Sequence, residues 1–120
     1  MPKPRAKRNE PAPRPRAPSE WRILLATNAA AKGSGELCRQ APGNVAKMWD
    51  ALTADPREAD NPNRQHRLKG GLSTGVIGDR TFDQSQYEVT SGGRVRYCID
   101  DADRSVWIVD AGTGHPKDTE

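Results

Sequence analysis

The sequence has little of what a large core or a covalent framework needs. Only 33% of its 120 residues are hydrophobic and 5% are aromatic, so we expect one domain with a small core. The two cysteines, Cys38 and Cys98, are far apart and lack the spacing of metal ligands. We expect two buried reduced thiols, while a single disulfide between them stays an alternative.

Long apolar runs are missing as well. The longest one near the front, Ile23-Leu24-Leu25-Ala26, falls far short of the roughly 20 residues that span a bilayer. The basic opening leads into prolines instead of an apolar segment, which indicates that there is no signal peptide. We therefore expect a soluble cytoplasmic protein that has no membrane partner.

Motifs for metals and nucleotides are also lacking. His66 and His115 are the only histidines, and neither lies in a spaced cluster with cysteine, so we expect no metal site. The glycine pairs at 70–71 and 92–93 fall between expected strands and not before a helix, which argues against a phosphate-binding loop. The sequence therefore predicts no cofactor.

Positive charge is concentrated at the front of the chain. The first twenty residues have a net charge of +4, whereas the whole chain has +3, so the rest is almost neutral. Residues 1–19 are rich in proline and basic side chains and predict a disordered or polyproline-like tail. We expect one folded domain over residues 20–120. The tail is either a solubilising arm or an electrostatic contact to nucleic acid.

The first half of that domain predicts a strand and a helical hairpin. Residues 21–27 are short and apolar, which is typical of a strand. Asn28 is expected to cap a helix over 29–40, and Asn44 a second helix that ends before Pro56. The second helix has an apolar stripe at helical spacing, which predicts core positions. The members of the stripe are Val45, Met48, Trp49 and Leu52.

The second half predicts an antiparallel meander. Strands are expected from Arg67, where Gly70-Gly71 would form a bulge, and over 84–90, 94–99 and 105–111, with a turn at 91–93. The fold class is thus α+β: an N-terminal strand and a helical hairpin packed on a mostly antiparallel, twisted sheet of four to five strands. The first strand would lie at the edge or pair with the last. Trp107 is expected in the core, although its strand is apolar on both faces and suits a central place or cover by a partner.

The strand over 94–99 has one apolar and one basic face. Alternation places Val95, Tyr97 and Ile99 on one side, and Arg94 and Arg96 on the other. Two arginines about 7 Å apart match neighbouring phosphate oxygens. The alternative is a solvated face in which these arginines pair with Glu88 or Asp100.

The order of these segments resembles the RelE/ParE superfamily of toxins from type II toxin–antitoxin systems. The motifs that carry the resemblance are HRLKGGL, YEV, GGRVRYCIDD, VWIV and GHPK, and they cover residues 21–117 with the helical hairpin. The resemblance implies a cognate antitoxin as partner and a metal-independent mRNA endoribonuclease, with the ribosome as a further partner. A non-catalytic inhibitor of DNA gyrase and a non-toxic binding relative stay as alternatives.

The resemblance also implies roles for individual residues. Arg94, His115 and Lys117 would be catalytic, with Arg94 on the scissile phosphate and His115 as acid or base. RNA phosphates would be bound by Lys69, Arg67 and Arg96. Two positions differ from the RNA-cleaving members, because the strand before the hairpin carries the acid Glu88 and the chain has no terminal tyrosine.

Overall fold

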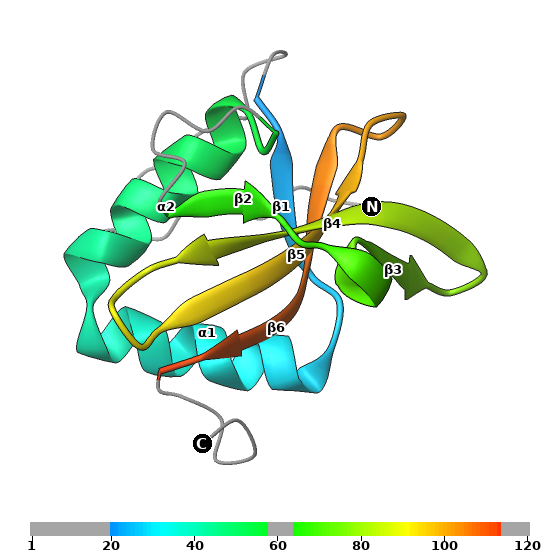
Figure 1. Cartoon of the computed structure of the whole chain (residues 1–120). Helices are drawn as coiled ribbons and strands as arrows, with labels where there is room; N and C mark the ends of the chain where they lie inside the picture. The colour runs from blue at the N-terminus through cyan, green and yellow to red at the C-terminus, as the bar shows by residue number, and fades with distance from the viewer. Residues whose placement is uncertain (1–19, 58–63, 114–120) are drawn as a thin grey trace, which may run out of the picture.

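A six-stranded sheet with two helices forms the part of the chain that the computed structural model describes, residues 20–57 and 64–113 (Figure 1). The elements are β1 (Arg22–Leu25), α1 (Asn28–Gln40), α2 (Pro42–Ala54), β2 (Gln65–Arg67), the 3-10 helix η1 (Gly70–Leu72), β3 (Thr74–Ile77), β4 (Arg80–Glu88), β5 (Arg94–Asp100) and β6 (Ser105–Gly112). Neither described helix is long and apolar enough to cross a bilayer. The expected tail over 1–19 lies outside the described residues.

The strand order is β1-β6-β5-β4-β2, and β3 pairs with the other half of β4. Among the described strands, β1 pairs with β6 in parallel and the other pairs are antiparallel. Both helices lie between β1 and the meander in the sequence, and such a long connection allows the parallel pairing. The predicted α+β class is confirmed, with six strands where four to five were expected. Both predictions for the first strand hold, since β1 is an edge strand and pairs with the last.

The two helices begin differently from the prediction. Thr27, not Asn28, caps α1, and its hydroxyl accepts a hydrogen bond of 2.9 Å from the Ala30 N–H. The second helix starts at Pro42, two residues before the expected cap, because a proline at the first helical position gives up an N–H that would have no partner. Asn44 instead donates to the Val89 carbonyl at 2.9 Å and ties α2 to the end of β4.

The core lies between these helices and one face of the sheet. Val95, Tyr97 and Ile99 of β5 are at most 2% exposed, as the alternation predicted. Leu37 of α1 and Leu52 of α2 close over them, and each buried side chain of this kind contributes roughly 1.5–3 kcal/mol. The stability of the fold therefore depends on this one helix-covered face.

Both tryptophans expected in the core lie outside it. Trp49 is 50% exposed, because it lies about 100° around α2 from the buried Met48. Trp107 alternates with the buried Val106 and Ile108, so it faces away from the helices and is only partly buried. These are corrections to the sequence interpretation, which had placed both tryptophans in the core.

The β2–β4 region also departs from the prediction. The strand expected to begin at Arg67 ends there, and Gly70, at φ 62°, opens η1 instead of a bulge. Gly78, at φ 64°, turns the chain between the paired residues Ile77 and Arg80, so β4 begins four residues earlier than expected. The β3–β4 hairpin extends away from the helices (Figure 1).

Candidate functional site

The sheet face opposite the helices is polar near the β4–β5 turn. Strand register there brings two rows of side chains together. One row runs Glu88, Arg94 and Gly112 across β4, β5 and β6. The other row runs across four strands and consists of His66, Gln86, Arg96 and Asp110. We call these two rows the basic rows, since cross-strand neighbours lie only about 5 Å apart and both arginines lie at their centre.

The two arginines differ in how they are paired. The Arg96 guanidinium lies 3.8 Å from the Asp110 carboxylate, a long contact between partly exposed groups. Arg94 is exposed, and among residues 20–57 and 64–113 no acidic side chain forms an ion pair with it. The expected pairing with Asp100 is wrong, because the Asp100 carboxylate lies 3.5 Å from Arg80. Arg94 therefore retains its charge for a ligand.

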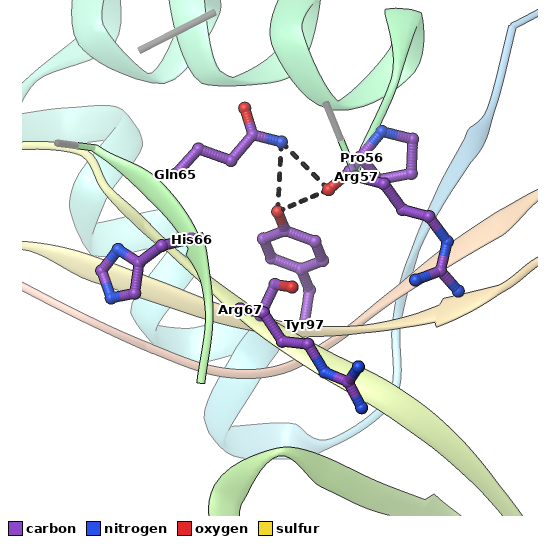
Figure 2. A pocket seen from close by; sticks show the side chains of 7 residues that line it. Pro56, Arg57, Gln65, His66, Arg67 and Tyr97 are labelled. Carbon is purple, nitrogen blue, oxygen red and sulfur yellow. Dashed lines mark hydrogen bonds between the residues drawn. The ribbon is translucent and has the colours of Figure 1, made fainter. Parts of the chain in front are cut away.

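His66 lies on this face as well, although the sequence interpretation gave it no functional role. It lies opposite Gln86, two strands and about 10 Å from Arg96, and it is exposed. Figure 2 shows its ring on the side of β2 away from Arg67. Alternation along Gln65, His66 and Arg67 would have placed His66 on the arginine face. It was missed because the strand was expected to start at Arg67.

Arg67 and Lys69 are not brought to Arg94. Arg67 lies on the helix side of the sheet, where its guanidinium donates to Asp83 at 2.8 Å. Asp83 also accepts from Arg57 at 2.9 Å, and Arg57 pairs further with Asp101. The hydrogen bond from Arg57 holds the pKa of the Asp101 carboxyl below its ordinary value. Lys69 is exposed just before η1, beside the middle of β4 and not at the β4–β5 turn.

A small cavity of about 120 Å³ lies on this helix side (Figure 2). At its base the Tyr97 hydroxyl donates to the Pro56 carbonyl at 2.9 Å, and the Gln65 amide donates to the same carbonyl at 3.0 Å and to the Tyr97 oxygen at 3.2 Å. These three hydrogen bonds hold the segment that follows α2 against β2 and β5. Burial raises the pKa of Tyr97 to about 12, so the phenol is neutral and structural.

Stability should therefore fall at high pH. The phenol ionises near its ordinary pKa of 10.0 in the unfolded chain and near 12 in the fold, so its contribution is present below pH 10 and is lost as pH rises toward 12. We expect the free energy of unfolding to drop by roughly 1.4 kcal/mol per pH unit in that window. Urea unfolding of the wild type and of Tyr97→Phe measures this. A Tyr97→Phe variant with the same slope would contradict the assignment.

Two predicted catalytic residues, His115 and Lys117, lie outside the described residues. The described chain stops at Thr113, one residue after Gly112, which is the register partner of Arg94. Their roles stay predictions. In the described parts of the chain, no three His, Cys, Asp or Glu side chains gather into a group that could hold a metal ion.

Residues Gly71 to Gly75 match the Gly-x-Ser-x-Gly pattern of hydrolase nucleophiles, but their geometry is different. That pattern needs a serine between a strand and a following helix. Ser73 has the reverse setting, since it follows η1 and precedes β3. Its hydroxyl donates to the Gly70 carbonyl at 2.8 Å, which assigns it to the turn.

The fold is shared with solved toxins of toxin–antitoxin systems. The YoeB–YefM complex of Staphylococcus aureus matches with a TM-score of 0.54 and 15% identity over 79% of this chain and 98% of that one. The RelBE2 complex of Mycobacterium tuberculosis matches with a TM-score of 0.53 and 17% identity over 81% and 99%. A metal-bound toxin from Helicobacter pylori gives 0.55 and 18% over 78% and 93%.

No protein-family model matches the sequence, and no curated protein is significantly similar to it. At this level of identity the structural matches establish the fold, which is the one that the RelE/ParE resemblance predicted. The match covers nearly the whole length of each toxin, so the helical hairpin and the sheet together make up the shared fold.

Proposed function

We propose that this chain is the toxin of a type II toxin–antitoxin system and that it cleaves mRNA without a metal ion. The observation that carries the proposal is Arg94, an exposed cation at the β4–β5 turn of a RelE-like fold that forms no ion pair with any acidic side chain of the described residues. Arg96 lies on the same strand face about 7 Å away. Together they offer guanidinium groups to two neighbouring phosphates on the sheet face opposite α1 and α2.

Cleavage of RNA by attack of its own 2′-hydroxyl group needs three protein groups. A base removes the proton of a 2′-hydroxyl, whose oxygen then attacks the adjacent phosphorus. A cation stabilises the charge that develops on the phosphoryl oxygens, and an acid protonates the departing 5′-oxygen. The products are a 2′,3′-cyclic phosphate and a free 5′-hydroxyl, so protons and electrons balance without a metal.

The basic rows supply candidates for the first two groups. Arg94 would hold the scissile phosphate and Arg96 the next one along the strand. His66 would be the base, because an imidazole exchanges protons near neutrality and this one is exposed on the arginine face. Glu88, directly opposite Arg94, is the second candidate for the base. The acid would come from His115, with charge support from Lys117, as the resemblance implies.

Replacing His66 with alanine should separate these two bases. If His66 is the base, we expect His66→Ala to lower the cleavage rate by roughly 10²–10⁴-fold while Glu88→Gln keeps most of the activity. If Glu88 is the base, the two results exchange. Single-turnover cleavage of an RNA oligonucleotide measures both variants. Full activity in both variants would show that neither His66 nor Glu88 is the base.

A cognate antitoxin is the proposed protein partner. The Staphylococcus and Mycobacterium structures are complexes of a toxin with its antitoxin. We expect the same kind of partner here, and a cytoplasmic location with mRNA and the ribosome as targets.

Induced expression separates the endoribonuclease from a gyrase inhibitor. We expect growth arrest with new mRNA 5′ ends that carry hydroxyl groups, and with plasmid supercoiling unchanged. Loss of supercoiling with intact mRNA would overturn the nuclease and support the gyrase alternative. Co-expression of the neighbouring reading frame, if it encodes the antitoxin, should restore growth.

A further inference from the structure

Trp107 is a large aromatic side chain that the core does not use. It faces away from the helices, between the buried Val106 and Ile108 that do face them. Its register partners are Leu24 on β1, which is also partly exposed, and Cys98 on β5. Neither α1 nor α2 covers this face; η1 and β3 cover the neighbouring Gln84 and Cys98, and the indole stays partly exposed.

The polar edge of the Trp107 indole is buried. Its Nε1 is shielded from solvent and has no hydrogen-bond partner among the described residues. The exposed part of Trp107 is therefore not the Nε1 edge. An indole whose polar edge is packed inward and whose remaining surface is open presents an apolar surface that is ready for another flat group.

Trp107 also lies next to the basic rows. Cys98 is its direct cross-strand neighbour, and Arg96 lies two residues before Cys98 on the same face, so the backbone positions of Trp107 and Arg96 are diagonal neighbours at roughly 7 Å. The Arg96 charge acts on the Cys98 thiol and lowers its pKa, although burial raises that pKa by more. Arg96 is therefore close to the Cys98–Trp107 pair.

We propose that Trp107 is a stacking platform for a nucleobase of the single-stranded RNA whose phosphates Arg94 and Arg96 bind. This rests on the proposed function. Spacing and charge indicate the occupant: the backbone positions of Trp107 and Arg96 lie roughly 7 Å apart, and base–aromatic stacking beside a cationic track is how single strands are held. The platform would fix the register of the RNA on the sheet before the chemical step.

The binding test uses ligands that differ only in their bases. An oligonucleotide of about eight 2′-O-methyl nucleotides cannot be cleaved through 2′-hydroxyl attack, and a matched abasic one keeps its phosphates. We expect the wild-type chain to bind the base-containing strand about tenfold more tightly than the abasic one, and Trp107→Leu to remove that difference. Trp107→Phe should keep part of it, because a smaller ring still stacks.

Matched controls distinguish stacking from general effects. Trp49→Leu removes an indole that is 50% exposed on α2, so it should bind both strands like the wild type. In a Trp49→Phe background, RNA should quench fluorescence, and the further change Trp107→Phe should abolish the quenching, because the remaining Trp21 is buried. Circular dichroism verifies that each variant is folded.

Failure of the platform and failure of the nuclease can be told apart. Equal binding of base-containing and abasic strands by the wild type, or no effect of Trp107→Leu, would overturn the platform while Arg94-dependent cleavage stands. If Trp107→Leu weakens only the antitoxin complex, the platform is also overturned and the surface is a protein contact. Base-dependent binding without any cleavage would keep the platform and overturn the nuclease.

Discussion

Replacing Arg94 with alanine is expected to relieve growth arrest and to lower RNA cleavage by roughly 10²–10³-fold, the usual loss when one group that stabilises transition-state charge is removed. Arg94 is exposed and has no acidic partner among residues 20–57 and 64–113, so its removal breaks no described ion pair. The melting temperature should therefore change little. Growth after induction and single-turnover cleavage of RNA measure the two effects.

Arg39→Ala is the matched control for Arg94→Ala. Arg39 is an exposed arginine in the last turn of α1, so the variant loses the same charge from the opposite side of the molecule. It should keep full toxicity. Equal loss of activity in both variants would indicate a general charge effect, and full activity in Arg94→Ala would overturn the proposed site.

Replacing Gly33 with alanine is expected to have the largest effect on stability. A Cβ at this position would lie 1.8 Å from the Ala111 carbonyl oxygen, so α1 and β6 would have to separate. Overpacking of a tight contact costs typically 1–3 kcal/mol, and we expect about 3 kcal/mol or more here because the obstacle is backbone. The midpoint of urea unfolding measures the loss.

Gly35, two residues later in the same helix, provides the control. Its Cβ would meet only the Arg39 side chain at 3.8 Å, so Gly35→Ala should stabilise the protein by about 1 kcal/mol through helix propensity. Opposite signs for the two substitutions would confirm the close contact between α1 and β6. A stabilising Gly33→Ala would contradict it.

The sequence predicted the elements that carry an unbroken alternation of apolar and polar residues or a clear stop signal. The alternation over Arg94 to Ile99 placed the core face and the arginine face of β5 correctly, and the residue before Pro56 ended α2 as expected. Elements governed by single glycines were missed. Gly70 and Gly78 adopt positive φ. Gly78-Asp79 is a two-residue hairpin signature that the interpretation of residues 72–80 overlooked, whereas the residues around Gly70 do not distinguish its turn from a bulge.

The candidate site was predicted in part for the same reason. Arg94 and Arg96 share a face by alternation within one strand, which sequence shows. His66 and Asp110 join them only through register across four strands, which depends on the whole sheet. Arg67 was expected beside them, but alternation in β2 places it on the opposite face from His66, where Asp83 holds it.

The most direct measurement of the central claim is the chemistry of the RNA ends produced by the purified chain. In a reaction of the chain and RNA with EDTA, or in a parallel reaction with programmed ribosomes and Mg²⁺ in place of EDTA, the wild type should generate 2′,3′-cyclic phosphate and 5′-hydroxyl ends. A substrate with a single 2′-deoxynucleotide at the cleavage position should stay intact, and Arg94→Ala should leave both substrates uncut. Cleavage of the 2′-deoxy substrate, or intact RNA in every reaction that contains the wild type, would contradict a metal-independent nuclease on the sheet face opposite α1 and α2.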